Sequence, residues 1–348
     1  MTSLSEMPEL VMENIIGFLD FRSVLNLRQV CRDFSNFIDD LKDSNLPDSK
    51  FKKLKLTVKK EKKLEFKIEY FDGSIDIIEY MENSRRYKEK ITNLENVNYL
   101  DVAIQNDLKW ILKFQRGNSV LFRFDSDIYN FHMQPGDEQF YQDVIEKLSN
   151  TTNQKIKTKA LHIRARQNSE FTTIIEMFDP KYLEELNFYP ICLVFETDQI
   201  SKTEQWKMAQ EFGCGQYFSD KHIKDLAHFS RSSILTECVS AEDVIYLKDC
   251  FVKSPTFEYC YLEMNETDAT RELLELWGSD VSETEDDGEW YFRMMHSDIL
   301  VVSVEKEGTW PYPFYINLYQ FPFHLVRLAP GFPTISSKTP FYTTASRI

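Results

Sequence analysis

Residues 7–20 have the sequence MPELVMENIIGFLD and decide the fold of the N-terminal part of this chain. Pro8 lacks an N–H and has a φ fixed near the helical value, so it suits the first turn of a helix, and Glu9 complements the positive helix end. Apolar residues then recur in two neighbouring rows, Val11-Ile15-Phe18 and Met12-Ile16-Leu19. One row can face the core of its own module, so we expect the other to face a partner.

Two more helices are predicted directly after this one. Asp20 or Ser23 can cap a second helix, and a third short helix would include Val30 and Cys31. Their apolar residues are Val24, Leu25, Leu27, Phe34, Phe37 and Ile38. Three helices in about forty residues are near the lower size limit for independent folding.

Three motifs in this segment, in order, resemble the F-box, and the likeness covers roughly residues 4–40. The family's opening Leu-Pro-x-Glu corresponds to Met7-Pro8-Glu9-Leu10, its Ile-x-x-x-Leu centre to Ile15 to Leu19, and its Val-Cys-[Arg/Lys]-x-[Phe/Trp] end to Val30 to Phe34. Met7 replaces the usual Leu and Phe21 the frequent Pro, and both keep apolar bulk. The alternative is an ordinary three-helix cap on a larger domain.

The resemblance implies that this module docks on a Skp-type adaptor and, through it, on the cullin of a cullin–RING ubiquitin ligase. The residues that it assigns to adaptor binding are Met7, Pro8, Glu9, Leu10, Met12, Ile15, Ile16, Leu19, Leu25, Leu27, Val30, Cys31 and Phe34.

Composition predicts a globular protein of two or three domains, because the chain has 348 residues, of which 42% are hydrophobic. The formal charge of −15 argues against general nucleic-acid binding. A local exception is the basic stretch Lys50–Lys63, which is either a basic binding patch or, as we favour, a solvated hairpin whose lysines discourage edge pairing.

The six cysteines show no zinc-ligand spacing and no disulfide framework, so we expect reduced thiols in a cytosolic or nuclear protein, without a metal or other cofactor. The first residues have no basic leader, so no signal peptide is expected, and no apolar run approaches the ~18 residues of a membrane-spanning helix.

The body of the chain alternates strands and helices. Asp72-Gly73 predicts a hairpin turn, helical patterns follow from about Leu94, and Asp137 can cap a further helix. A strand–helix–strand unit around Leu161 to Leu186 is repeated around Leu235 to Tyr261. The spacing lies within the ~20–29-residue period of leucine-rich repeats. We therefore expect an α+β to α/β fold: an F-box, a β-hairpin region, and a curved, leucine-rich-repeat-like αβ domain.

The second half of the chain resembles the FTH domain of the nematode F-box A family, over roughly residues 150–305. The matching elements are Glu204 to Ala209, which carries Trp206, the acid-capped helix start Glu242-Asp243, and the strand Phe257 to Leu262. The resemblance implies a domain that presents targets to the ligase. We expect boundaries at 1–45 for the F-box, 46–149 for a connecting region, 150–328 for the FTH-type domain and 329–348 for a loose tail.

Within the αβ domain, outward-facing strand residues are candidates for target binding, because the concave side of a solenoid is built from its strands. These candidates are His162, Arg164, Asn187 and Tyr189. The target itself is unknown. Trp206 is expected in the core rather than in an interface.

No catalytic set is predicted. Cys214, between Gly213 and Gly215, suggests a thiol in a flexible loop near His222 and His228, but nothing marks these residues as a nucleophile and its base. The predicted function is therefore a non-enzymatic substrate receptor of a ubiquitin ligase. The alternatives are a non-degradative protein that sequesters an intracellular toxin, a foreign protein or a translational regulator, and an RNA-associated factor that uses Lys50–Lys63.

Overall fold

The structure is a computed structural model of the full chain. The residues that it describes are 7–42, 45–48, 51–115, 119–127, 136–151, 155–191, 194–267, 269–278, 288–296, 298–306 and 314–321. Lys50, Cys192 and the tail 329–348 lie outside these residues. The described residues form two compact units, the first within Met1–His162 and Thr173–Leu183 and the second within Ile163–Thr172 and Glu184–Ile348.

The first three elements are helices, as expected: α1 (Glu9–Phe18), α2 (Phe21–Arg28) and α3 (Arg32–Asp40). Pro8 is the residue before α1, and Asp20 caps α2 because its Oδ1 accepts a hydrogen bond from the Ser23 N–H over 2.9 Å. The starts of α1 and α2 therefore follow local signals in the sequence, whereas Val30 and Cys31, which were expected within the third helix, precede α3.

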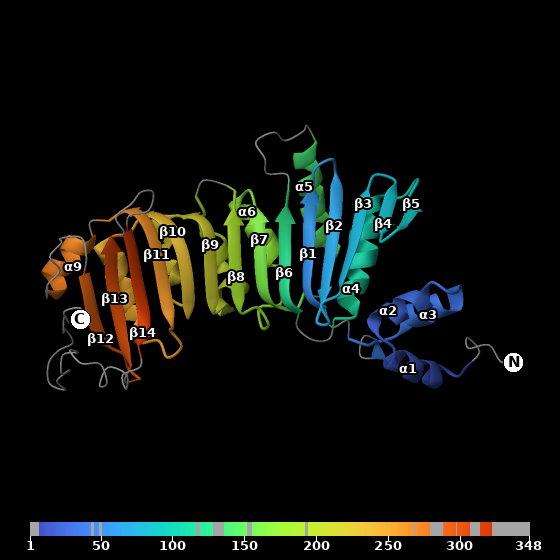
Figure 1. The fold of residues 1–348 in the computed structure, drawn as a ribbon, viewed down its shortest axis with the longest axis horizontal. Coiled ribbons are helices and arrows are strands. Elements are labelled where there is room, and N and C mark those ends of the chain that lie inside the picture. The colour runs from blue at the N-terminus through green and yellow to red at the C-terminus, as the bar shows by residue number, and fades with distance from the viewer. Residues whose placement is uncertain are drawn as a thin grey trace. The chain divides into compact units, whose positions relative to one another are not determined.

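The first unit continues with a β-sheet whose hydrogen-bonded order is β5-β4-β3-β2-β1-β6 (Figure 1). Its strands are β1 (Phe51–Lys59), β2 (Lys63–Tyr70), β3 (Ile75–Met81), β4 (Ser84–Tyr87), β5 (Lys90–Asn93) and β6 (Ser119–Ser126). The expected turn joins β2 to β3, and Gly73 in it has a φ of +80°. The basic stretch does form a hairpin, but β1 pairs with both β2 and β6. The prediction that its lysines protect a sheet edge is therefore wrong.

Helices cover one side of this sheet: η3 (Asp101–Leu108), α4 (Lys109–Lys113) and α5 (Asp137–Thr151). Tyr141 of α5 packs on Phe124 of β6 with 5.9 Å between the ring centroids, and both side chains are almost fully buried. Aromatic pairs of this kind bury large apolar areas. The core of the first unit lies between this side of the sheet and the helices.

In the second unit the hydrogen-bonded strand order is β8-β9-β10-β11-β14-β13-β12. The strands are β8 (Glu185–Pro190), β9 (Glu211–Phe218), β10 (Arg231–Cys238), β11 (Tyr259–Glu266), β12 (Gly288–Arg293), β13 (Ile299–Lys306) and β14 (Phe314–Phe321). β8 to β11 are parallel, whereas β14, β13 and β12 are antiparallel additions. β7 (Thr158–Ala165) and α6 (Asn168–Ile175) contribute residues to both units.

Two helices of the second unit, α7 and α8, begin at side-chain caps. Thr203 Oγ1 accepts from the Trp206 N–H, and Ser240 Oγ accepts from the Asp243 N–H, each over 3.2 Å. Gly278, with a φ of +80°, follows the last helix. The elements are η4 (Ile200–Lys202), α7 (Glu204–Met208), η5 (Asp220–Leu226), α8 (Ala241–Phe251) and α9 (Ala269–Trp277).

The chain thus has three N-terminal helices followed by mixed β-sheet with interspersed helices, an α/β fold. One expectation is wrong: Gly213, Cys214 and Gly215 lie within β9 and not in a loop. Within the described ranges, none of the helices is long and apolar enough to cross a membrane.

Candidate functional site

The first candidate site is the outer face of α1. Leu10 is 70% exposed, Val11 41% and Phe18 91%. Their spacing places them on one side of the helix, which turns about 100° per residue. Met12 and Ile16 lie on the opposite side and are buried. We call Leu10, Val11 and Phe18 the apolar α1 face.

A small pocket adjoins the start of this helix. It has a volume of about 230 Å³ and lies between residues of α1 and α3. Met12 and Phe34 line it although they are only 3% and 7% exposed. The other lining residues are Met7, Glu9, Asp33 and Phe37.

The structure sorts the residues assigned to adaptor binding into three groups. Six are exposed: Met7, Pro8, Glu9, Leu10, Val30 and Cys31. Four are partly buried: Ile15, Leu19, Leu25 and Leu27. Met12, Ile16 and Phe34 are buried, so they belong to the core of the module and, for Met12 and Phe34, to the wall of its pocket. The exposed Val11 and Phe18 were missed, although their spacing with Ile15 was visible in the sequence.

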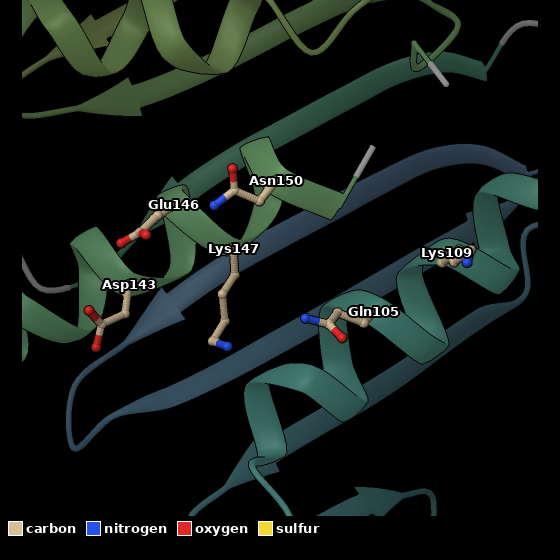
Figure 2. A pocket seen from close by; sticks show the side chains of 6 residues that line it. All are labelled: Gln105, Lys109, Asp143, Glu146, Lys147 and Asn150. Atoms are coloured by element: carbon tan, nitrogen blue, oxygen red, sulfur yellow. The ribbon is translucent and has the colours of Figure 1, made fainter. Parts of the chain in front are cut away.

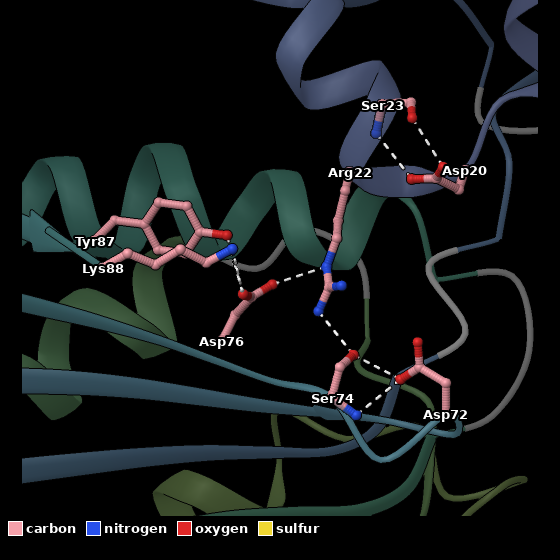
Figure 3. A network of polar contacts seen from close by, with 8 residues as sticks. All are labelled: Asp20, Arg22, Ser23, Asp72, Ser74, Asp76, Tyr87 and Lys88. Carbon is pink, nitrogen blue, oxygen red and sulfur yellow. Dashed lines mark hydrogen bonds and ion pairs between the residues drawn. The ribbon is translucent and has the colours of Figure 1, made fainter. Parts of the chain in front are cut away.

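The F-box module is fixed to the first sheet through Arg22 of α2 (Figure 3). Its Nε lies 3.0 Å from Oδ2 of Asp76 on β3, and its Nη2 donates to Ser74 Oγ over 2.9 Å. The guanidinium also lies 4.1 Å from the centre of the Tyr70 ring. Tyr87 Oη donates to the other oxygen of Asp76 over 3.0 Å. Asp76 is only 5% exposed, and a buried charge needs partners. Here Arg22 of the F-box module and Tyr87 of the sheet supply them.

Burial and the Asp76 charge both raise the pKa of Tyr70, while Arg22 opposes this shift. The phenol therefore stays neutral at physiological pH. The Arg22 contact consequently does not depend on ionisation of Tyr70.

Apolar and cation–π contacts also attach the F-box module to the rest of the first unit. Phe21, the residue that replaces the frequent Pro of the F-box pattern, packs edge-on against Phe114 with a centroid separation of 4.9 Å. The guanidinium of Arg28 lies 4.3 Å from the Trp110 ring and also pairs with Asp39, with a shortest N–O distance of 2.7 Å. The module is therefore attached through both α2 and the segment around α4.

Several lysines of the basic stretch are neutralised within the first unit. Lys55 and Arg123 each lie 3.1 Å from the buried Asp125 carboxylate, and Lys63 lies 2.6 Å from Glu61. Lys59 pairs with Glu65. Burial, helped by the charge of Arg123, lowers the pKa of Lys53. These ion pairs disfavour the interpretation of the stretch as a nucleic-acid surface.

The four expected target-binding residues are partly buried and alternate with core residues along their strands. In β7, His162 and Arg164 alternate with Leu161 and Ile163. In β8, Asn187 and Tyr189 alternate in the same way with Leu186 and Phe188. In each strand these residues point away from the core residues that flank them.

Glycines in β9 make room for two of these side chains. A Cβ on Gly213 would lie 2.2 Å from Asn187 Oδ1, and a Cβ on Gly215 would lie 2.8 Å from Tyr189 Cδ1. Asn187 and Tyr189 therefore lean across β9. Glycine at both positions is explained by this close approach and not by a loop.

No nucleophile–base pair forms around Cys214. This residue is buried, and its Sγ lies 3.3 Å from the carbonyl oxygen of Gln216. His222 lies 3.3 Å from Asp198 and from Asp225, and the ring of His228 lies 2.8 Å from the Trp206 carbonyl oxygen. Burial lowers the pKa of His228, which keeps the ring neutral. Trp206 itself is buried against Phe212 and Phe229, as expected for a core residue.

A larger pocket of about 560 Å³ lies between α5 and the η3–α4 segment (Figure 2). Its walls are polar, and Lys147 in it pairs with Asp101 over 2.6 Å. The lining residues are Gln105, Lys109, Asp143, Glu146, Lys147 and Asn150. Across the described part of the chain, no three His, Cys, Asp or Glu side chains are grouped in a way that could hold a metal ion.

Comparison with known proteins agrees with both resemblances. Residues 4–45 match the F-box domain, and residues 138–276 match the FTH domain. F-box A protein 224 of Caenorhabditis elegans is 24% identical over 275 residues, which cover 76% of this chain and 67% of that protein. No solved structure matches the chain. The chain is therefore an F-box and FTH domain protein related to F-box A protein 224 of Caenorhabditis elegans.

Proposed function

We propose that this protein is the substrate receptor of an SCF-type cullin–RING ubiquitin ligase. The F-box implies binding to a Skp-type adaptor. The adaptor would connect the chain to a cullin, and the αβ body would bind the target. Proteins of this family are ligase adaptors and not catalysts. The receptor would act by holding a target near the ubiquitin-loaded enzyme, so its contribution to the rate is proximity.

The observation that carries this proposal is the apolar α1 face. Phe18 is 91% exposed at the end of α1, and Leu10 is 70% exposed near its start. Burial of a side chain of this size typically contributes about 1.5–3 kcal/mol. A partner that covered the apolar α1 face would gain several such contacts. Large exposed apolar patches usually mark interaction sites.

The αβ body supports the second part of the proposal. β8, β9, β10 and β11 are parallel and start at residues 185, 211, 231 and 259, each joined to the next by helical segments. This supports the expected leucine-rich-repeat-like organisation. We assign target binding to the strand side of the second unit that carries Arg164, Asn187 and Tyr189, and keep His162 of the first unit as a separate candidate. We retain the expected boundaries of 1–45, 46–149, 150–328 and 329–348.

The decisive experiment is co-elution of the purified chain with a Skp-type adaptor. Leu10→Asp combined with Phe18→Asp should abolish co-elution, because two carboxylates would be placed in an apolar interface. The matched control is Ile91→Asp combined with Leu276→Asp, since both of these residues are apolar and 61% exposed outside the F-box. The control should co-elute like the wild type. Unchanged co-elution of the Leu10/Phe18 variant would exclude this mode of docking.

A non-degradative binding protein would keep the same folds but act by sequestration. Mass spectrometry of pulled-down complexes first identifies the target. The two functions then differ in what happens to that target in cells. Target loss that depends on Leu10 and Phe18 and stops on proteasome inhibition supports the ligase receptor. A persistent, inactive complex supports sequestration.

A further inference from the structure

The second unit has a sheet side rich in tyrosine. Alternate residues of β11 and β14 are buried, namely Cys260, Leu262, Met264, Ile316 and Leu318, and the residues between them point the other way. Tyrosines of β9, β11 and β14 are among the residues on this other side. We call Tyr217, Tyr259, Tyr261, Tyr315 and Tyr319 the tyrosine face.

Helices of this unit pack on the opposite side of the sheet. Trp206 of α7 lies 4.7 Å from Phe212 of β9, measured between ring centroids. Trp277 of α9 lies 5.3 Å from Trp290 and 4.9 Å from Phe292 of β12. All three strand residues, Phe212, Trp290 and Phe292, belong to the buried series and not to the tyrosine series. These helices therefore pack on the side opposite the tyrosine face, on which Tyr259 is 37% exposed and the other four tyrosines are partly buried.

The pairing register brings this face together from strands far apart in the sequence. Leu235 of β10 is paired with Tyr217 on one side and with Glu263 on the other. Glu263 is paired in turn with Tyr315 of β14. The rings of Tyr261 and Tyr315 are stacked with 5.7 Å between their centroids. Asn265 Nδ2 donates to Tyr217 Oη over 2.9 Å, which orients that phenol.

The charges among these tyrosines are mainly acidic. Glu237 of β10 and Glu263 of β11 have no cation within ion-pair distance among the described residues. The Arg231 guanidinium on the same side is already paired with Glu211 over 2.7 Å and with Glu258 over 3.0 Å. The face therefore carries carboxylates without a balancing cation.

We propose that the tyrosine face, with Glu237 and Glu263, binds a basic, arginine- or lysine-containing segment of the target protein. This inference rests on the proposed function and names the chemistry of its target. Tyrosine rings supply rigid contact area and attract cations at their faces. The two carboxylates supply charge complementarity, and the net charge of −15 steers cationic partners toward the chain. The same carboxylates disfavour an acidic peptide and the pairing of two copies through this face.

The test uses full-length chain in complex with a Skp-type adaptor and three fluorescein-labelled peptides of equal length. In these peptides Arg, Gln or Glu alternates with Thr over twelve residues. Anisotropy titrations should give an affinity for the Arg peptide at least about tenfold above that for the Gln peptide, and weaker binding still for the Glu peptide. Binding of the Arg peptide should also weaken as salt is raised.

Two variants separate a local face from the net charge of the chain. Glu237→Lys with Glu263→Lys should lower the affinity for the Arg peptide by about tenfold or more. Glu272→Lys with Glu275→Lys, two exposed glutamates of α9, changes the net charge equally and should leave the affinity within about twofold. Tyr261→Ala should also weaken binding without changing the charge.

The inference is wrong if the Arg and Gln peptides bind equally, if neither binds, or if the α9 control weakens binding as much as the Glu237/Glu263 variant. An unchanged circular dichroism spectrum shows that each variant is folded. Retained co-elution with the adaptor leaves the proposed receptor function intact even if the inference is wrong. Loss of the receptor function would show instead as failure of the wild-type chain to co-elute with the adaptor.

Discussion

Arg22 and Asp76 are 54 residues apart in sequence, yet Arg22 Nε lies 3.0 Å from Asp76 Oδ2 and joins the F-box to β3. Asp76 is nearly buried, whereas the Arg22 side chain is 38% exposed. Solvent screening therefore reduces the value of the ion pair itself. Removal of the Arg22 side chain nevertheless leaves the buried Asp76 carboxylate with fewer hydrogen-bond partners.

We predict that Arg22→Ala lowers the free energy of unfolding by about 1–3 kcal/mol, because Asp76 loses a charged hydrogen-bond donor. Urea denaturation measures this change. In a double-mutant cycle with Asp76→Asn the two effects should not be additive. Arg32→Ala, at an exposed position of α3, serves as the control and should change stability by less than about 0.5 kcal/mol. Additive effects in the cycle would show that the two side chains are not energetically coupled.

A second prediction concerns Gly213 and Asn187. Gly213→Ala should destabilise the second unit by about 1–3 kcal/mol, because its Cβ would lie 2.2 Å from Asn187 Oδ1. Thermal or urea denaturation measures the loss.

The rescue variant makes this prediction specific. Asn187→Ala in the Gly213→Ala background should recover most of the stability, because it removes the clashing amide. If Gly213→Ala remains equally unstable with and without the Asn187 amide, the glycine is needed for another reason.

The elements with local signals were predicted correctly. Pro8 marks the start of α1 because its fixed φ suits a first helical turn, and Asp20 marks the start of α2 because its side chain satisfies a backbone donor within the same turn. The Asp72-Gly73 turn likewise needs only neighbouring residues. Both family resemblances rest on such short, ordered motifs.

The parts that were missed depend on contacts between distant segments. β9 was taken for a loop because Gly213 and Gly215 are poor strand residues, and the reason for them is the side chains of Asn187 and Tyr189 on another strand. The sequence also showed two apolar rows in α1 without showing which faces inward. Packing within the module decides that Met12 and Ile16 are buried and Phe18 is exposed. The tyrosine face likewise appears only once the strand register is known.

The third prediction is a pH dependence of stability from His228. Burial lowers the pKa of this histidine below 6.5, and the carbonyl groups of Trp206 and Asp225 only partly oppose the shift. Between this lowered pKa and 6.5 the unfolded chain binds a proton that the folded chain does not. The contribution of His228 to stability is therefore fully present above pH 6.5 and decreases as the pH falls through this window.

Urea denaturation at several pH values between 8 and 5 measures this effect. The difference in unfolding free energy between wild type and His228→Gln should be constant from pH 8 to 7 and should shift in favour of the variant as the pH falls below 6.5. A difference that does not change with pH would contradict the assigned shift.

The last prediction uses two cysteines in opposite environments. Cys31 is exposed in the F-box, whereas burial raises the pKa of the Cys260 thiol to about 12. Only the thiolate reacts with iodoacetamide, so Cys31 should be alkylated in the folded chain and Cys260 only after unfolding. Peptide mass spectrometry over a time course measures both rates.

Addition of a Skp-type adaptor turns the same measurement into a footprint. If Cys31 lies in the adaptor interface, its alkylation should slow by about a hundredfold when the free adaptor is at 100 times its Kd, because only unbound chain reacts. The partly buried Cys250 of α8 lies outside the F-box and should react at an unchanged rate. Equal slowing of both cysteines would indicate general stabilisation. An unchanged Cys31 rate despite co-elution would place Cys31 outside the adaptor interface, and the apolar α1 face would remain the proposed centre of that interface.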